Sequence, residues 1–325
     1  MEENTFHSRV DLSVLNEQIK KIKEEIGKVI VGQEQLVEFL ITAILADGHV
    51  LIEGVPGVAK TLTAKLLSKI ISVDFSRIQF TPDLMPSDVL GTSVYNLKTS
   101  EFEFKSGPIF SNLVLIDEIN RAPAKTQAAL FEVMEERQVT VDGHTHKMKS
   151  PYLVLATQNP IEQEGTYRLP EAQLDRFLFK VIVDYPNLEQ EITILTNHHE
   201  RKGSVPISEV MPVLSGEQIV QLRQFANHVH VEPTLLKYVA QIVQETRNNP
   251  LLFLGASPRA SLAILTGSKA HAVIKGRDFV SPEDIKLIAK PVLRHRIALS
   301  PEKEMEGIST DDVIKLIIDK IEVPR

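Results

Sequence analysis

The chain has 325 residues, of which 43% are hydrophobic and 24% are charged, and its formal net charge is −7. These values are ordinary for a globular protein of about two domains, and the acidic balance disfavours general affinity for nucleic acid. The absence of cysteine excludes disulfides, thiolate catalysis and cysteine-ligated zinc. No apolar run is long enough to span a bilayer and no signal-peptide core is present, so we expect a cytoplasmic protein without membrane insertion.

Two helices are expected at the start of the chain. Apolar residues recur at helical spacing over residues 11–30 and again over residues 34–46. The turn Val31-Gly32-Gln33 separates the two patterns, and Asp47-Gly48 ends the second. This helix pair therefore lies directly upstream of the next motif.

That motif is a strand, a glycine-bearing loop and a helix. Residues 50–52 form a short apolar run, and a helical pattern begins at Lys60 and continues through residue 71. This context is typical of a phosphate-binding loop, in which backbone N–H groups and a helix N-terminus surround an anion. The expected loop residues are Gly54, Val55, Pro56, Gly57, Val58, Ala59, Lys60 and Thr61.

Each residue type in this loop has a chemical reason. Gly54 and Gly57 permit backbone conformations that a side chain forbids. Lys60 is expected at the β- and γ-phosphates and the Thr61 hydroxyl at Mg²⁺. Ala59 stands where the usual motif has glycine. A turn between a strand and a helix needs no ligand, so neighbouring motifs must decide the reading.

A second strand is expected over residues 75–80, followed by an irregular segment over residues 81–107. Short strands at 92–95 and 101–105 predict a protruding hairpin within it. Such long excursions are either functional or simple surface insertions, and both readings stay open.

The run Leu113-Val114-Leu115-Ile116 predicts a parallel strand buried on both faces. It ends in Asp117 and Glu118, at the edge where open α/β sheets bind ligands. We expect Asp117 to hold Mg²⁺ and Glu118 to act as the general base toward water. An acidic pair that only caps the next helix is the alternative.

A helix is expected over residues 123–137 and a hairpin over residues 138–147, around Asp142-Gly143. His144 and His146 share one face of that hairpin. They could contribute to a metal site, but two ligands alone make a poor one, and an exposed loop face is favoured.

A further strand is expected over residues 152–157, a short helix over 169–177 and a fifth parallel strand over 178–183. Asn159 follows the first of these strands, so it should lie at the same sheet edge as Asp117 and Glu118. Its amide could orient the attacking water, although Asn-Pro also favours a turn.

Everything after residue 187 is expected to be helical. Helices are predicted over residues 188–199, 216–227, 233–247, 258–274, 282–289 and 310–321. Arg259 falls in the first turn of one of them, where a cation opposes the helix dipole unless an anion joins it. We therefore expect Arg259 to reach a phosphate from this second region, with a surface ion pair as the alternative.

Four segments together resemble the MoxR family of AAA+ ATPases across nearly the whole chain. They are residues 54–61, Asp117-Glu118-Ile119-Asn120-Arg121-Ala122, Ala156-Thr157-Gln158-Asn159-Pro160 and Leu169-Pro170-Glu171-Ala172-Gln173-Leu174-Asp175-Arg176-Phe177. The resemblance implies an α/β fold: a doubly wound, parallel five-stranded P-loop domain with two hairpin insertions, then a small all-α lid. The implied domains are residues 1–186 and 187–325.

The resemblance also implies roles for individual residues around bound ATP. Lys60 and Thr61 correspond to Walker A, Asp117 and Glu118 to Walker B, Asn159 to sensor 1 and Arg259 to sensor 2. Val31 and Gly32 resemble the adenine-contacting segment, and the phosphate loop continues through Leu62. Arg176 is the candidate arginine finger for a neighbouring subunit, with Arg121 as its rival and a local pair between Arg176 and Asp175 as the alternative.

An arginine supplied by a neighbour implies a homo-oligomeric ring, expected to be a hexamer, that hydrolyses ATP with Mg²⁺. The resemblance suggests a protein client with a von Willebrand factor A domain, and no nucleic-acid partner is expected. Three alternatives stay open: a magnesium-chelatase-type motor subunit, a helicase-like nucleic-acid motor and a nucleotide-gated scaffold that does not hydrolyse ATP.

Overall fold

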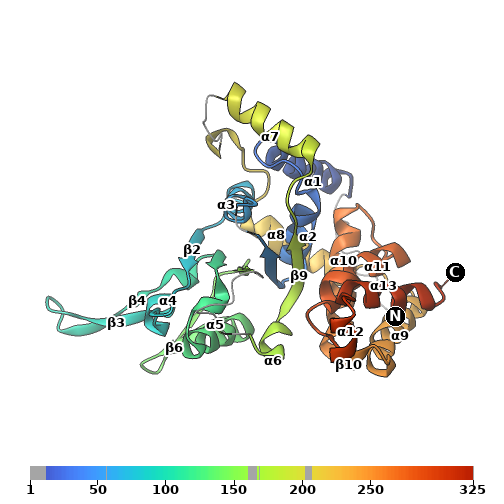
Figure 1. The fold of residues 1–325 in the computed structure, drawn as a ribbon. Helices are drawn as coiled ribbons and strands as arrows, with labels where there is room; N and C mark the ends of the chain where they lie inside the picture. The colour runs from blue at the N-terminus through green and yellow to red at the C-terminus, as the bar shows by residue number, and fades with distance from the viewer. Residues whose placement is uncertain (1–11, 56, 160–166, 168, 202–206, 325) are drawn as a thin grey trace, which may run out of the picture.

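The structure is a computed structural model that describes residues 12–55, 57–159, 167, 169–201 and 207–324. At its centre lies a five-stranded parallel sheet in the order β2-β5-β8-β1-β9 (Figure 1). The five strands are β1 His49–Gly54, β2 Phe75–Gln79, β5 Leu113–Asp117, β8 Leu153–Gln158 and β9 Phe177–Val183. All five strands predicted from the sequence therefore form one sheet.

Helices cover both faces of the sheet because side chains along each strand alternate between two cores. Within β5, Leu113 and Leu115 belong to one buried cluster, while Val114 and Ile116 belong to the other. The first cluster includes side chains of α1 Leu12–Gly27, α2 Glu34–Leu45 and α3 Lys60–Ile70, and the second includes α5 Ala124–Glu136. The predicted doubly wound α/β class is confirmed.

Both predicted hairpins are present. β3 Gly91–Asn96 pairs with β4 Glu101–Ser106, and β6 Gln138–Val141 pairs with β7 His144–Lys147. Figure 1 shows the β3–β4 hairpin extending well away from the sheet, beyond the short helix α4 Pro86–Leu90. The two hairpins touch, because Ser93 Oγ donates a hydrogen bond to Asp142 Oδ2.

The C-terminal region is mainly helical and packs on the sheet domain through α10, which contacts α2, and α11, which contacts β9. Its helices are α7 Leu188–Glu200, α8 Gly216–Asn227, α9 Pro233–Asn248, α10 Pro258–Ile274, α11 Pro282–Leu293, α12 Pro301–Met305 and α13 Thr310–Lys320. Among the helices of the described chain, none has the length and apolar character that crossing a membrane requires.

Three local predictions need correction. The C-terminal region is not wholly helical, because β10 Leu252–Leu254 pairs with β11 Ala298–Leu299. The helix expected over residues 169–177 is only Glu171–Leu174, since Phe177 is already drawn into β9 beside His49. The short helices α12 and α4 were not predicted, and α4 lies within the segment expected to be irregular.

Candidate functional site: a nucleotide pocket and a distant arginine pair

The loop between β1 and α3 has the backbone shape that its glycine pattern predicts. Gly57 has φ 87° and Ala59 has φ 56°, so both occupy the left-handed region. A Cβ on Gly54 would lie 2.7 Å from the carbonyl oxygen of Val183, so close backbone packing requires glycine there. Pro56, also predicted to line the loop, lies outside the described residues.

The start of α3 fits an anion. Within this helix, all of whose residues are described, no side chain caps the N-terminus and the first turn contains no acidic residue. The first N–H groups of a helix lack partners inside the helix, so they are suited to phosphate oxygens. Lys60 Nζ donates to the carbonyl oxygen of Gly54 at 2.6 Å, which folds the lysine back over the loop. Thr61 follows directly in the first turn.

A cavity of about 210 Å³ opens beside this loop. It joins residues from both sides that the sequence assigned to nucleotide binding: Val31, Gly32, Gly57, Val58, Ala59 and Leu62. Gln33 ties the two segments together, because its side-chain amide donates to the carbonyl oxygen of Val58. Asp184, Pro186 and Ile194 complete the lining from the opposite side.

Sequence reasoning did not identify those last lining residues. Pro186 marks the end of the first implied domain, and Ile194 falls within the helix predicted over residues 188–199. The pocket therefore lies between the N-terminal helices, the phosphate loop, the segment that leads into α7 and α7 itself.

Asp117 ends β5 and is nearly buried, with 7% of its surface exposed. Its Oδ2 lies 2.6 Å from Arg77 Nε, and its Oδ1 accepts a hydrogen bond from Thr157 Oγ1 at 3.1 Å. The same Thr157 hydroxyl accepts from the backbone N–H of Glu118. Thr157 thus holds both acidic residues in place. The sequence analysis did not identify this role, because it depends on β5 and β8 being neighbours in the sheet.

Glu118 has a left-handed backbone, with φ 58° and ψ 52°. For a residue with a long side chain this conformation is uncommon, and such outliers concentrate at functional sites. Its Oε2 accepts from Gln79 Nε2 at 2.8 Å and lies 3.1 Å from Arg121 Nε. The carboxylate is therefore held from two sides.

Asn159 lies at the same edge. Gln158, the last residue of β8, pairs with Glu53 of β1, so Asn159 follows at the level of Gly54 and the loop. Its side chain is nearly buried, with 9% of the residue exposed. The structure therefore brings Lys60, Asp117, Glu118 and Asn159 to the C-terminal edge of the sheet.

Arg176 and Arg259 lie at the opposite edge. Arg176 directly precedes Phe177, which pairs with His49 at the beginning of β1, whereas the phosphate loop follows the end of β1. Six residues of strand span about 17 Å at about 3.3 Å per residue. Arg259 was expected to reach the nucleotide from the second region, but within this chain it is not at that edge.

Both arginines instead pair with one carboxylate near the end of α5. Arg176 Nη1 lies 3.3 Å from Glu135 Oε2, and Arg259 Nη2 lies 3.0 Å from Glu135 Oε1. Arg176 also donates to the carbonyl oxygen of Phe131 at 2.8 Å. The local pair between Arg176 and Asp175 is not what holds this arginine, because Asp175 pairs with Arg296.

Two predicted oxygen ligands are of the kind that Mg²⁺ prefers: the Asp117 carboxylate at the end of β5 and the Thr61 hydroxyl in the first turn of α3. Among the described residues no cluster of three His, Asp or Glu side chains is suited to a separate metal ion. His146 instead stacks on Phe104 of the other hairpin, with ring centroids 4.2 Å apart.

The sequence matches known families over both regions. Residues 49–179 match the ATPase family associated with various cellular activities (AAA), and residues 244–317 match the AAA lid domain. The chain is 45% identical to Chaperone MoxR1 of Mycobacterium tuberculosis over 310 residues, which cover 93% of this chain and 81% of that protein. It is 47% identical to the uncharacterised protein YeaC of Bacillus subtilis over 304 residues, 94% of each.

A solved structure agrees with these matches. The crystal structure of a Cytophaga hutchinsonii protein, provisionally named as an ATPase, superposes with a TM-score of 0.89 at 42% identity and covers 97% of both chains. The parallel sheet, the phosphate loop with its acidic partners, the helical lid and the extent of these similarities show that the chain belongs to the MoxR family of AAA+ ATPases.

Proposed function

We propose that this protein hydrolyses ATP in a homo-oligomeric ring, a hexamer, and uses the energy to remodel or assemble a client protein. One observation carries the ring: the nucleotide pocket and the Arg176–Arg259 pair lie at opposite edges of the same sheet. A chain cannot bring Arg176 to its own phosphate loop without disrupting the pairing of β9 with β1. A neighbouring chain can present its pocket to that edge.

In this proposal residues 1–186 form the nucleotide-binding domain and residues 187–325 form a lid that moves against it, with Ile194 of the second region completing the pocket lining. The purine occupies the cavity at Val31 and Gly32, and the phosphates lie on the loop from Gly54 to Leu62. Lys60 neutralises phosphate charge and Asn159 orients water. Bound through Thr61 and Asp117, Mg²⁺ supplies charge neutralisation at the β- and γ-phosphates.

Glu118 is the proposed general base. Asp117 is assigned to the cation, so Glu118 is the carboxylate of this acidic pair that can accept a proton from the attacking water. Arg121 pairs with Glu118 at this same edge. An arginine that serves a neighbouring chain has to lie away from its own pocket, so we assign the trans-acting role to Arg176 and place Arg259 beside it.

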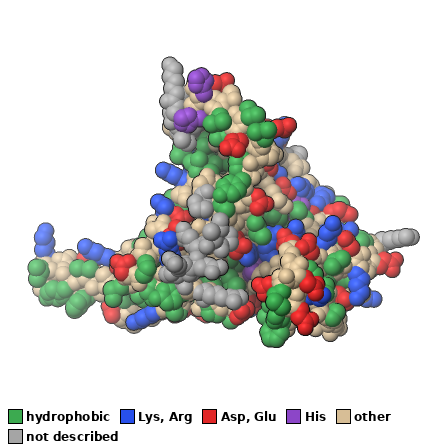
Figure 2. Space-filling view, viewed as in Figure 1, with side chains coloured by type: hydrophobic (Ala, Val, Ile, Leu, Met, Phe, Trp, Pro, Cys, Tyr) green, Lys and Arg blue, Asp and Glu red, His purple; other side chains and the backbone are tan. Residues whose placement is uncertain are grey.

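The client is proposed to be a protein, with a von Willebrand factor A domain as the first candidate. The name of the MoxR1 relative, a chaperone, supports a protein client. The protruding β3–β4 hairpin supports it too, because its exposed side chains include Val94, Tyr95, Leu97 and Phe102. Figure 2 shows hydrophobic side chains on the surface of this protrusion. Its two lysines are balanced by two glutamates within residues 91–106, unlike the basic channel that a nucleic-acid strand requires.

Three variants test the catalytic assignment. Lys60→Ala should abolish nucleotide binding, measured by calorimetry with Mg-ATP. Glu118→Gln should bind ATP and not turn it over. Arg176→Ala should bind ATP normally and lose about 10³-fold or more in kcat, the contribution of an arginine supplied to a phosphoryl transition state.

A mixing experiment tests the trans assignment directly. Lys60→Ala chains keep their Arg176, and Arg176→Ala chains keep their pockets, so rings that contain both should recover turnover. Recovery supports the ring proposal. Mixed rings that stay as inactive as either parent would contradict it, provided that light scattering shows that rings form.

The client proposal has its own test. Glu118→Gln rings loaded with ATP should bind a purified von Willebrand factor A domain protein, and ADP should release it. Leu97→Asp and Phe102→Asp on the hairpin should weaken that binding while basal turnover stays unchanged. Binding that is indifferent to both hairpin variants would reject the hairpin as the client surface.

A further inference from the structure

Three consecutive residues of the lid, 294–296, make side-chain hydrogen bonds to the backbone of β9, the edge strand of the sheet. Arg294 Nη1 donates to the carbonyl oxygen of Lys180 at 3.0 Å, and His295 Nε2 lies 3.0 Å from the carbonyl oxygen of Phe177. Arg296 follows and makes more contacts than either. These residues come directly after α11, so the strand that carries Arg176 at its start is fastened to the lid.

Arg296 makes hydrogen bonds to the residues before and after Arg176. Its Nε donates to Asp175 Oδ1 at 2.6 Å, and its Nη2 donates to the carbonyl oxygens of Asp175 and Phe177 at 2.9 and 2.6 Å. Its Nη1 donates to the carbonyl oxygens of Leu178 and Val292. The residues on both sides of Arg176 are thus held by one guanidinium group.

All the N–H donors of this guanidinium can be accounted for by these bonds, and its side chain is only 3% exposed. A buried arginine of this kind is costly to leave without its carboxylate, so the contact resists partial opening. We therefore expect a shift of this part of the lid to be transmitted to Asp175 and the neighbouring Arg176, which directly precede the residues that β9 places in the sheet.

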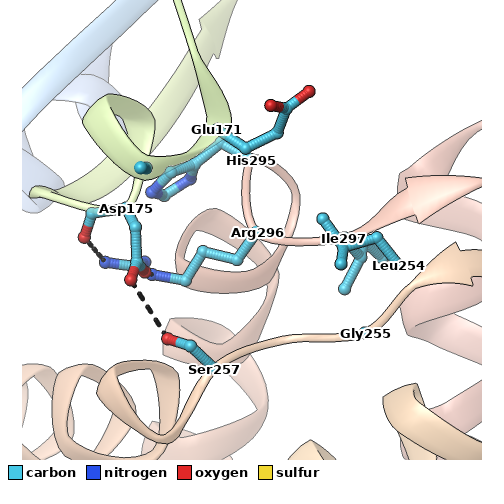
Figure 3. A pocket seen from close by; sticks show the side chains of 9 residues that line it. Glu171, Asp175, Leu254, Gly255, Ser257, His295, Arg296 and Ile297 are labelled. Atoms are coloured by element: carbon cyan, nitrogen blue, oxygen red, sulfur yellow. Dashed lines mark hydrogen bonds and ion pairs between the residues drawn. The ribbon is translucent and has the colours of Figure 1, made fainter.

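The second oxygen of Asp175 connects to another part of the lid. Ser257 Oγ donates to Asp175 Oδ2 at 3.1 Å (Figure 3). Ser257 directly precedes α10, two residues before Arg259. Asp175 consequently joins the lid residue Arg296, the start of α10 and the segment that bears Arg176.

A cavity of about 220 Å³ borders this junction and is lined by Glu171, Asp175, Leu254, Ser257 and Arg296, among others. Figure 3 shows Asp175, at the end of α6 (Glu171–Leu174), reaching toward Arg296 and Ser257 of the lid beside that space. Because this cavity separates part of α6 from the lid, the polar contacts of Asp175 are a direct connection between the two at this point.

We propose that Arg296 is a positioning residue for Arg176: it transmits the position of the lid to the arginine that acts on the neighbouring subunit's nucleotide. The inference rests on the proposed trans role of Arg176. Catalysis depends steeply on placement, and a displacement of about 1 Å costs about 10²-fold in rate. Loosening Arg296 should therefore lower turnover in a neighbour's pocket while the nucleotide pocket of its own chain stays intact.

The first test compares Arg296→Lys with Arg294→Lys. Both replaced residues are lid arginines that pair with a carboxylate and donate to a carbonyl of β9, but Arg294 contacts Asp311 and Lys180, away from Arg176. Arg296→Lys should lower kcat for ATP about 10- to 100-fold with KM within twofold. Arg294→Lys should leave kcat within about twofold.

Because Arg296→Lys could destabilise the lid, Asp175→Asn provides a second variant. It keeps the size of the side chain and removes the charge that Arg296 pairs with. Both variants are first checked for ring formation and thermal unfolding. If either folds, assembles and retains kcat within twofold of the unmodified protein, the proposal is overturned; a selective loss of kcat in the folded variant supports it.

The decisive test uses mixed rings. Arg296→Lys with Lys60→Ala should recover turnover, because the Lys60→Ala chains supply a well-placed Arg176 to intact pockets. Arg296→Lys with Arg176→Ala should not recover, since neither chain supplies one. Equal recovery in both mixtures would overturn the role of Arg296. Failure of the reference mixture, Lys60→Ala with Arg176→Ala, would instead reject the trans role of Arg176 itself.

Discussion

Arg77 Nε lies 2.6 Å from Asp117 Oδ2, so the carboxylate at the end of β5 is paired with a cation from the neighbouring strand β2. The arginine side chain is about half exposed, at 52%, whereas that of Asp117 is 10% exposed. If Asp117 binds Mg²⁺ as proposed, Arg77 would compete with the ion for this carboxylate from the solvent side. Removing it should make the carboxylate more available to the metal ion.

Arg77→Met should accordingly lower the Mg²⁺ concentration that gives half-maximal ATP hydrolysis. A partly exposed ion pair contributes about 0.5–1 kcal/mol, which corresponds to about two- to fivefold. The measurement is a titration of turnover with Mg²⁺ at saturating ATP. Arg77→Lys, which keeps the charge, should shift the midpoint less, and an increased requirement in Arg77→Met would contradict the competition.

Gln79 should restrain basal hydrolysis. Its Nε2 donates to Glu118 Oε2 at 2.8 Å, and a carboxylate oxygen engaged in this way is less available to water. Gln79→Leu should raise basal kcat about three- to tenfold, equivalent to about 0.7–1.4 kcal/mol. Gln244→Leu, an exposed glutamine on α9, is the control and should change nothing. Slower turnover in Gln79→Leu would show that Gln79 instead orients the base productively.

Ala59→Gly should stabilise the protein. The left-handed backbone of Ala59, with φ 56° and ψ 22°, is unfavourable for any residue that carries a Cβ. Glycine removes that penalty, and the free energy of unfolding should rise by about 0.5–1 kcal/mol even after its greater freedom in the unfolded chain. Denaturant titration measures the change.

The control for that experiment is Ala46→Gly, where φ is −80°. There glycine relieves no strain, so the free energy of unfolding should fall by about 0.5–1 kcal/mol. If the two substitutions shift stability in the same direction, the strain assigned to Ala59 is not real.

His271 joins the lid to the N-terminal helices. Its Nδ1 lies 2.6 Å from Asp284 Oδ1 of α11, and its Nε2 lies 2.8 Å from Glu38 Oε1 of α2. Burial lowers the pKa of His271, but the hydrogen bonds with Asp284 and Glu38 outweigh it and the pKa is raised. Its hydrogen bond with Glu38 holds the pKa of that carboxyl far below its usual range.

This direction determines how stability depends on pH. Because the folded-state pKa of His271 lies above its unfolded value of about 6.5, its contribution is complete below about pH 6.5 and is lost as pH rises through the folded value. The Tm difference between the unmodified protein and His271→Gln should be greatest near pH 6 and smaller at pH 9. The control is His230→Gln at an exposed position, which should show little Tm difference from the unmodified protein at either pH. If His271→Gln lowers Tm by the same amount at both pH values, His271 contributes through packing alone.

The sequence determined the local elements well because their signals are local. The run from Leu113 to Ile116 is apolar at every position, and the structure buries all of it in a central strand. The helix predicted over residues 216–227 is α8, Gly216–Asn227, and the side chain of Ser215 before it accepts from the N–H of Gln218. The phosphate loop was also recognisable, since glycine spacing and a following lysine reflect backbone constraints within a few residues.

Tertiary structure alone decided which side chains meet. Arg259 and Glu135 are 124 residues apart, and no periodicity relates them. Ser257 directly precedes α10, yet its side chain does not cap that helix and donates to Asp175, 82 residues away. Contacts of this kind depend on the order of strands in the sheet and on where the lid packs. Those are set by the burial of whole faces, so the opposite placement of the pocket and the two arginines emerged only with the fold.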